Sequence, residues 1–270
     1  GAGSMCAAAT TQSSSTSLFF EQLHAAANRL LLLDYDGTIA PFTVDRKCAV
    51  PYPSIPELLD SISSTCRTRL VLISGRAARE IPALLGLNPL PEIWGAHGLE
   101  RLYPNNRFEL AFLSAEASRS IATAENILQE GGLGELCEIK TGAIAVHWRG
   151  LKASHVDEIR MQCYRLLGPL ACHGNLLLNE FNGGMELKAQ AASKGNAVRT
   201  VLAETPSDVP VAYMGDDLTD EDAFHAINGR GLSVLVRETF RSTAAQAWLR
   251  PPGEVIQFLN DWIHACGGDV

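Results

Sequence analysis

The chain has 270 residues, enough for one large domain or two modest ones and for a hydrophobic core that needs no disulfide or metal staples. Hydrophobic residues make up 46% of the chain and charged residues 19%, which excludes an intrinsically disordered protein. The formal net charge is −8, from 22 Lys and Arg against 30 Asp and Glu. We therefore expect no nucleic acid and no membrane as partner, although a metal and a few local cations would still admit a small anionic substrate.

The cysteines and the N-terminal residues indicate the cellular compartment that we expect for this protein. The 7 cysteines include no Cys-x-x-Cys pair, which argues against a disulfide framework or a thiolate zinc site and favours a reducing compartment. No apolar run approaches the ~20 residues of a membrane-spanning helix. We expect residues 1–17 to be a disordered leader with an expression scar at Gly1–Met5, and the protein to be cytoplasmic.

Strands and helices alternate in the first part of the chain. After a helix over Ser17–Asn28, an unbroken run of leucines ends at Asp34, and a run that is apolar on both faces suits a central parallel strand. The next predicted elements are a helix over Ile55–Ser64, a strand over Arg69–Ile73, a helix over 77–85 and a strand over Glu92–Gly95. This alternation predicts an α/β fold with a parallel sheet.

The middle of the chain has another rhythm. The pattern predicts helices over Ala115–Glu130 and Lys152–Leu167 and strands over Leu136–Lys140, Ile144–Arg149, Leu176–Phe181 and Met185–Lys188. Glycine-containing turns at 141–142 and 182–184 join these strands into antiparallel hairpins. We therefore expect a small α+β unit at residues 109–188, inserted into a core formed by residues 18–108 and 189–270.

The α/β rhythm then resumes. We predict a helix over Lys194–Leu202, a strand over Val209–Met214, a helix over Asp220–Ile227, a strand over Ser233–Val236 and a last helix over Glu254–Ala265. Candidate site residues lie just after several of these strands, where open α/β sheets bind their ligands.

Asp34 and Asp36 directly follow the first buried strand. One carboxylate there could attack phosphorus to form an aspartyl-phosphate, and the other could protonate the leaving alkoxide. Two such carboxylates repel each other, and a divalent cation relieves the repulsion. Asp-Gly is also a common turn dipeptide, so this motif alone leaves a purely structural role open.

A second acidic cluster, Gly215–Asp222, follows the strand Val209–Met214. Oxygen ligands of this kind favour Mg²⁺ over zinc. An acidic helix N-terminus is the alternative, and it accounts for Glu221 and Asp222 but not for Asp216 and Asp217 at the end of a strand.

Ser74 follows the strand Arg69–Ile73, and Lys194 opens a helix. A hydroxyl and backbone N–H groups at a strand end could bind a phosphoryl oxygen, and a lysine could neutralise the transferring group. Taken separately, both residues also fit ordinary roles in a loop and at the surface.

The order of these motifs resembles that of the haloacid dehalogenase superfamily across the whole ordered chain. More narrowly, the chain is similar to the trehalose-6-phosphate phosphatases through Asp34–Pro41, Ile73–Arg76, Gly95–Glu100, Glu186–Lys188 and Gly215–Phe224. This resemblance implies a Rossmann-like parallel-sheet core with an inserted C2B-type cap. It also implies Mg²⁺-dependent hydrolysis of trehalose 6-phosphate through an aspartyl-phosphate, with no obligate protein partner.

The resemblance implies catalytic roles residue by residue. Asp34 would be the nucleophile, and Asp36 the general acid and then the general base. Thr38, Ser74 and Lys194 would orient and neutralise the phosphoryl group. Mg²⁺ would be bound by the Asp34 carboxylate, the Asp36 backbone carbonyl and Asp216, with Asp217 and Asp220 supporting these ligands or completing the site.

The sugar-binding candidates are less specific. Glu186 and Lys188 are two apart on one strand and share a face, as do His147 and Arg149, and a surface ion pair is the alternative. The further candidates lie in loops after strands: Gly75, Arg76 and His97. Ala189 and Ser193 depart from the proline and asparagine that the family leads us to expect. Two alternatives therefore stay open: a phosphatase of sucrose 6-phosphate or mannosyl-3-phosphoglycerate, and a catalytically idle regulatory module.

Overall fold

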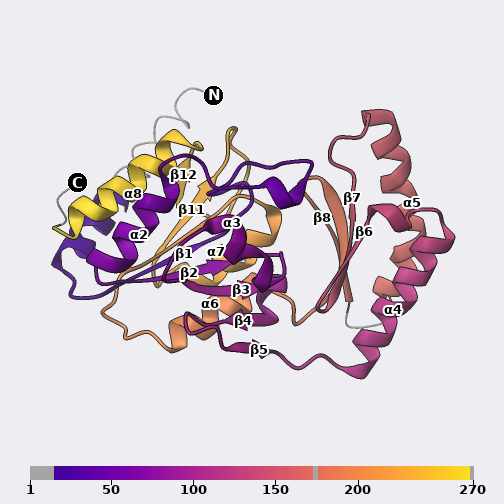
Figure 1. Cartoon of the computed structure of the whole chain (residues 1–270), viewed down its shortest axis with the longest axis horizontal. Coiled ribbons are helices and arrows are strands. Elements are labelled where there is room, and N and C mark those ends of the chain that lie inside the picture. Colours follow the sequence, from indigo (N-terminus) through magenta and orange to yellow (C-terminus); the bar gives the residue numbers. More distant parts are fainter. Residues whose placement is uncertain (1–14, 173–175, 268–270) are drawn as a thin grey trace.

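The computed structural model describes residues 15–172 and 176–267, so the predicted leader lies mostly outside the described residues. Residues 15–25 are helical. The rest forms two units, each with its own sheet, that lie side by side (Figure 1). None of the helices in the described part of the chain has the length and apolarity to cross a membrane.

The larger unit contains an eight-stranded sheet in the order β12-β11-β10-β1-β2-β3-β4-β5. Six of its strands run parallel: β1 (Arg29–Leu33), β2 (Thr68–Ile73), β3 (Glu92–Gly95), β10 (Val211–Gly215), β11 (Leu232–Val236) and β12 (Ala247–Leu249). The antiparallel strands β4 (Glu100–Leu102) and β5 (Phe108–Leu110) extend one edge. The predicted α/β class is confirmed, while β4, β5 and β12 were not predicted.

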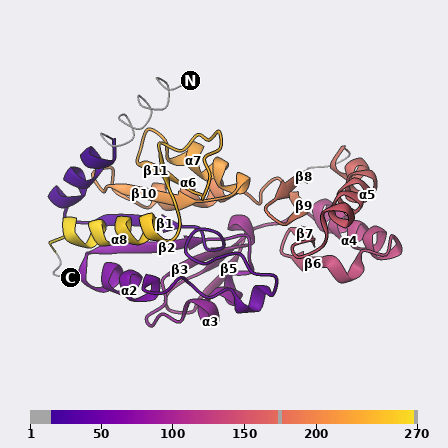
Figure 2. The ribbon, with the colours of Figure 1, turned by 90° about the horizontal axis from the view of Figure 1, so that it is seen from above.

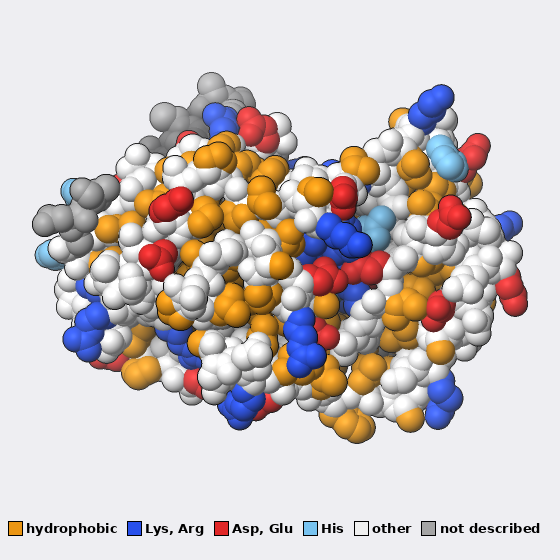
Figure 3. Space-filling view, viewed as in Figure 1, with side chains coloured by type: hydrophobic (Ala, Val, Ile, Leu, Met, Phe, Trp, Pro, Cys, Tyr) orange, Lys and Arg blue, Asp and Glu red, His pale blue; other side chains and the backbone are white. Residues whose placement is uncertain are grey.

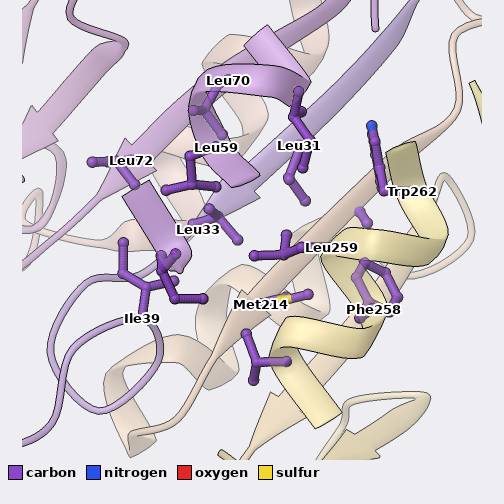
Figure 4. Packing of buried hydrophobic residues seen from close by; sticks show 14 of the residues in the cluster. Leu31, Leu33, Ile39, Leu59, Leu70, Leu72, Met214, Phe258, Leu259 and Trp262 are labelled. Atoms are coloured by element: carbon purple, nitrogen blue, oxygen red, sulfur yellow. The ribbon is translucent and has the colours of Figure 1, made fainter. Parts of the chain in front are cut away.

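Helices cover both faces of this sheet (Figure 2). One face carries α2 (Ile55–Thr65), α3 (Ile81–Leu85) and α8 (Gly253–Ala265), and the other carries α6 (Lys194–Ala203) and α7 (Glu221–Ile227). Leu31 and Leu33 pack with Trp262 on the first face (Figure 4), whereas Leu30 and Leu32 pack on the second. Because successive side chains of a strand point to opposite faces, the unbroken leucine run of β1 supplies both halves of the core.

Several short 3₁₀ segments occur in loops or next to α-helices. They are η1 (Arg46–Cys48), η2 (Ala78–Glu80), η3 (Ala96–Gly98), η4 (Gly134–Leu136) and η5 (Leu218–Asp220). The single helix predicted over 77–85 is therefore wrong in detail, because it divides into η2 and the short α3, with Pro82 in the first turn of α3. The helix predicted from Asp220 likewise begins as η5 before α7.

The smaller unit, called the cap unit below, consists of an antiparallel sheet and two helices. Its strands are ordered β6-β7-β9-β8. They span Cys137–Lys140, Ala143–His147, Gly184–Ala189 and Leu176–Phe181, and the helices are α4 (Ala115–Glu130) and α5 (Ala153–Cys172). The prediction ended α5 at Leu167, five residues too early, because Gly168 and Pro169 resemble a helix end.

The two faces of the cap sheet differ in chemistry. Ile144, Val146, Met185 and Leu187 pack against the helices in a separate hydrophobic cluster. The register pairs Glu138 with Ala145 and Ala145 with Glu186, so these side chains share the opposite face, which is turned toward the core (Figure 1). We propose that this unit is the predicted cap. The expected boundaries of 109 and 188 lie close to the ends of β5 and β9, at Leu110 and Ala189.

Candidate active site

A cavity lies between the carboxyl ends of the parallel strands and the polar face of the cap sheet. Its wall includes residues from both units: Asp34, Asp36, Phe42, Arg46, Ser74, Gly75, Arg76, His97, Lys140, His147, Arg149, Asn182, Glu186, Lys194, Asp216 and Asp217. Charged and histidine side chains gather at this hollow in the space-filling view (Figure 3). The sequence prediction of a polar site at these strand ends agrees with this arrangement.

Asp34 lies directly after β1 and is buried. Its Oδ1 accepts the Tyr35 backbone N–H at 2.8 Å and lies 3.1 Å from Nζ of Lys194. Burial, and secondly the charge of Asp220, raise the pKa of Asp34 to about 7, although Lys194 opposes this. The ammonium of Lys194 therefore lies where it can stabilise the ionised, nucleophilic form of Asp34.

Asp34, Asp216 and Asp220 form a buried acidic cluster whose oxygens lie within 4.8 Å of one another. Burial, together with the charge of Asp34, raises the pKa of Asp216 well above its usual range. The lysine facing the cluster, Lys194, supplies one positive charge against three carboxylates. Crowded buried carboxylates of this kind fit a divalent cation with oxygen ligands, because such an ion removes the repulsion that keeps protons on them.

Asp220 has a different environment from its neighbours. It accepts hydrogen bonds from Lys194 Nζ at 3.1 Å, from the Tyr213 hydroxyl at 2.5 Å, and from the backbone N–H groups of Asp216 and Asp217 at 3.0 Å. Burial alone would raise its pKa, but Lys194 and the Tyr213 hydroxyl lower it below the usual range. Asp220 thus orients the loop that carries Asp216.

Asp36 is bound to Arg76, which donates from Nε and Nη2 to the two carboxylate oxygens. The backbone N–H of Arg76 donates in turn to the Ser74 hydroxyl at 3.0 Å. Gly75 lies between them on the cavity wall and packs against the ring of His97, which leaves no room for a Cβ. The structure thus brings this predicted group of residues together.

Three predicted residues do not line the cavity: Asp220, whose hydrogen bonds are given above, and Thr38 and Lys188. Thr38 is fully buried, and its hydroxyl donates to Asp216 Oδ1 at 3.3 Å. Lys188 is buried beside Glu186 on β9, and burial lowers its pKa. In this conformation, Thr38 and Lys188 are therefore not placed to contact a phosphoryl group or a sugar. Thr38 instead orients the side chain of Asp216.

His97 connects the core to the cap unit. Its Nε2 lies 2.8 Å from Glu186 Oε2, and Lys140 Nζ lies 3.2 Å from the other oxygen of Glu186. Burial lowers the pKa of His97 to about 4, so at neutral pH the ring is uncharged and donates from Nε2. Its Nδ1 is then an acceptor, buried and without a partner among the described residues, and so suited to a hydroxyl donor.

Three further polar contacts join core and cap unit. The backbone N–H of Asn182 donates to Asp217 at 2.8 Å, and the Thr141 hydroxyl donates to Glu100 at 2.7 Å. Arg46 forms an ion pair with Glu138. The hydrogen bonds of Arg149 lie within the cap unit, where it donates to the backbone and side-chain oxygens of Asn182.

Sequence reasoning missed several residues of this site. Glu138 and Lys140 alternate on one strand like the pairs that were singled out, so that signal was available. Tyr213 lies within an apolar strand and looks like an ordinary core residue. Arg46 and Asn182 lie in loops, and nothing in the local sequence marks them.

Comparison with known proteins places the chain in a family. The family model described as trehalose-phosphatase matches residues 32–250. A trehalose-phosphate phosphatase of Mycobacterium marinum is 29% identical over 244 residues, which covers 85% of this chain and 60% of that protein. The chain thus spans about three fifths of the length of the mycobacterial relative.

Solved structures agree on the fold. The C-terminal domain of a C. albicans trehalose-6-phosphate phosphatase superposes with a TM-score of 0.77 at 21% identity, covering 94% of this chain and 97% of that one. A haloacid dehalogenase-like hydrolase from B. subtilis gives 0.59 at 15% identity, covering 86% and 99%. The fold is therefore of the haloacid dehalogenase type, and because the family model covers more than half of its length, the chain belongs to the trehalose-phosphatase family.

Proposed function

We propose that this chain hydrolyses trehalose 6-phosphate to trehalose and phosphate, with Mg²⁺ as cofactor. The observation that carries the proposal is the buried cluster of Asp34, Asp216 and Asp220 beside Lys194, at the floor of a cavity whose other wall is the polar face of the cap sheet. The family assignment supports the same reaction.

In the first step the Asp34 carboxylate attacks phosphorus. A bond forms between its oxygen and phosphorus while the bond from phosphorus to the sugar oxygen breaks. Asp36, two residues along the chain on the same cavity wall, donates a proton to the departing oxygen. The leaving sugar is thereby released as a neutral alcohol.

In the second step water attacks the aspartyl-phosphate. Asp36, now ionised, takes a proton from the water as the new bond to phosphorus forms and the bond to Asp34 breaks. Lys194, 3.1 Å from Asp34, neutralises charge on the nucleophile and on the phosphoryl oxygens in both steps.

Asp34 and Asp216, with the backbone carbonyl of Asp36, would hold the cation. A bound Mg²⁺ would neutralise the crowded carboxylates and polarise the phosphoryl oxygens. The raised pKa of both carboxyl groups supports the need for such an ion.

The sugar half of the substrate would lie against the cap sheet. Glu186 and Lys140 carry charged groups into that side of the cavity, and His97 lies on the same wall. Charged and polar groups that still have hydrogen-bonding capacity suit a polyhydroxylated disaccharide, whose hydroxyls both donate and accept.

A substrate panel tests the proposal. Purified protein with Mg²⁺ is assayed for phosphate release from trehalose 6-phosphate, sucrose 6-phosphate, mannosyl-3-phosphoglycerate and glucose 6-phosphate, with Asp34→Asn as the inactive control. We expect trehalose 6-phosphate to be strongly preferred. Preference for another sugar phosphate would replace the substrate, and no release from any of them would leave the regulatory alternative.

A further inference from the structure

Arg46 reaches the cap unit from the core loop that follows the nucleophile. Asp45 caps the short segment η1 by accepting the Lys47 backbone N–H, which fixes the direction of the loop at Arg46. The guanidinium then crosses the cleft to the carboxylate of Glu138 on β6. In Figure 1 this indigo part of the chain extends from the core toward the cap strands.

The same loop makes further contacts with the cap unit. The guanidinium carbon of Arg149 lies 4.3 Å from the centre of the Phe42 ring, and a Cβ built on Gly150 would lie 3.1 Å from Val44. Phe42, Val44 and Arg46 all line the cavity. The loop is therefore part of the cavity wall, and Arg46 gives this part of the wall a positive charge.

Glu138 accepts two hydrogen bonds on one oxygen. The first comes from Arg46 Nη1, and the second from His147 Nε2 at 2.7 Å. Burial, and secondly the charge of Arg46, lower the pKa of His147 to about 3, so the ring is neutral and donates from Nε2. The carboxylate is thus held by one donor from the core and one from the cap unit.

Arg46 retains capacity for a ligand. A guanidinium has five N–H donors, and among the described residues its hydrogen bond to Glu138 uses one. The ammonium of Lys194 lies beside the nucleophile, where the phosphate would bind, whereas Arg46 lies at the cap sheet. Because Arg46 lines the cavity and is bound to the cap sheet, its remaining donors are within reach of a sugar bound there.

We propose that Arg46 is a specificity-determining residue, whose guanidinium binds the sugar of the substrate while its bond to Glu138 holds the cap unit over it. The proposal rests on the function proposed above, because it assumes a phosphorylated disaccharide. A substrate without a sugar gains nothing from these donors. Arg46 thus adds selectivity from the core side of a cavity whose other sugar-facing groups lie mainly on the cap sheet.

The test compares a disaccharide phosphate with a small one. Values of kcat and KM are measured for trehalose 6-phosphate and for p-nitrophenyl phosphate with wild type, Arg46→Ala and Arg46→Lys. Lys47→Ala is the matched control, because Lys47 is the exposed neighbour of Arg46 in the same short segment. Thermal unfolding of each variant shows whether it is folded.

We expect Arg46→Ala to lower kcat/KM for trehalose 6-phosphate by about tenfold to a hundredfold, mainly through KM, which is the loss typical of a hydrogen bond to a charged group. The loss with p-nitrophenyl phosphate should be smaller, so the ratio of the two kcat/KM values falls. Arg46→Lys should recover part of the ratio, since lysine keeps the charge but not the planar fork. Lys47→Ala should keep the wild-type ratio.

Equal losses on both substrates, or a ratio for Arg46→Ala within about twofold of wild type, would overturn the role of Arg46. If Arg46→Ala does not fold, the ratio for Arg46→Lys decides in the same way. Titration calorimetry gives a second readout: trehalose 6-phosphate should bind Asp34→Asn more tightly than Asp34→Asn with Arg46→Lys. A wild-type protein without activity on trehalose 6-phosphate refutes the proposed function instead, so the two failures are distinguishable.

Discussion

Arg76 binds both oxygens of Asp36, with Nε 2.7 Å from Oδ2 and Nη2 2.8 Å from Oδ1. This side-on pairing fixes the plane of the carboxylate as well as its position. Arg76 is itself 4% exposed and is held by the Ser74 hydroxyl through its backbone N–H. Arg76 therefore positions Asp36, and because both carboxylate oxygens accept from it in this conformation, one of them must leave Arg76 to carry the proton of the first step.

Without this positioning, activity should fall most on substrates whose leaving group needs a proton. We expect Arg76→Ala to lower kcat for trehalose 6-phosphate about a hundredfold, within the range of general acid catalysis. The loss should be clearly smaller for p-nitrophenyl phosphate, because p-nitrophenolate leaves without protonation. Steady-state kinetics on both substrates measure the difference.

Asp36→Asn should show the same dependence on the leaving group. Arg79→Ala is the control, because its guanidinium packs over Phe108, 4.2 Å from the ring centre, and does not line the cavity. Equal losses for Arg76→Ala on both substrates would show that Arg76 does not act through proton donation.

Magnesium should stabilise the folded protein through the acidic cluster. Asp34 and Asp216 resist ionisation because they are buried together, and a bound cation removes that penalty. Free Mg²⁺ at a hundred times its dissociation constant should add about 2.7 kcal/mol to the free energy of unfolding. Thermal unfolding in EDTA and in rising Mg²⁺ measures this gain.

Asp34→Asn should be inactive and should lose most of the gain from Mg²⁺. In EDTA its melting temperature should be no lower than that of wild type, since one of three crowded carboxylates is gone. Asp208→Asn, at an exposed position, is the control and should respond to Mg²⁺ like wild type. An Asp34→Asn protein with the full response would place the ion elsewhere.

The features that depend on residues close together in the sequence could be predicted, whereas those that depend on contacts between distant residues mostly could not. The leucine run of β1 predicted a central strand because its neighbours in sequence determine which faces are apolar. The three-residue strands β4, β5 and β12 carry no comparable pattern, since pairing with neighbouring strands defines them. The carboxylates after β1 and β10 were predicted to meet because parallel strands end at one edge of the sheet.

Contacts across the cleft could not be predicted in this way. Arg46 and Glu138 are 92 positions apart, and their pairing depends on how the cap unit sits over the core. Glu186 and Lys188 share a face of β9 as predicted, yet Glu186 lines the cavity and Lys188 does not. Alternation in a strand specifies a face, whereas packing of the two units decides which side chains reach the cavity.

Gly37 should tolerate no side chain. Its φ is +78°, and a Cβ built there would lie 2.2 Å from Asp216 Oδ2 and 2.5 Å from the Phe42 ring. Gly37→Ala would therefore displace the acidic cluster as well as strain the backbone, and we expect activity to fall at least about a hundredfold, the loss caused by misplacing reacting groups by ~1 Å. Phosphate release and thermal unfolding measure the two effects.

Gly86→Ala separates backbone strain from the clash. Gly86 has a similar φ of +69°, but a Cβ there has nothing within 4 Å. Both variants should lose about 1–3 kcal/mol of stability through the left-handed conformation. Only Gly37→Ala should lose much more activity than its lower stability alone would cause. Equal activity of the two variants would contradict this account.

The buried His97 and the half-buried His147 should each reduce stability as the pH is lowered below 7, because both stay neutral in the folded protein. Burial lowers the pKa of His97 to about 4 and that of His147 to about 3. In the unfolded chain histidine takes up a proton near pH 6.5, so between about pH 6.5 and 4 the unfolded state binds more protons than the folded state. Linkage then requires the histidine contribution to the free energy of unfolding to decrease as the pH falls through this window, whereas Asp34 and Asp216, whose pKa values are raised, contribute with the opposite sign.

Each of these histidines should contribute a slope of up to about 1.4 kcal/mol per pH unit below pH 6. Urea unfolding at pH 7.5, 6.5 and 5.5 measures the slope for wild type and for His147→Gln, which has one titrating group fewer. As the pH falls, wild type should lose stability relative to His147→Gln. His155→Gln is the control, since its side chain is exposed in the fold and should leave the slope unchanged. If wild type and His147→Gln changed in stability equally between pH 7.5 and 5.5, His147 would have to be protonated in the fold, and the neutral donor assigned to Glu138 would be wrong.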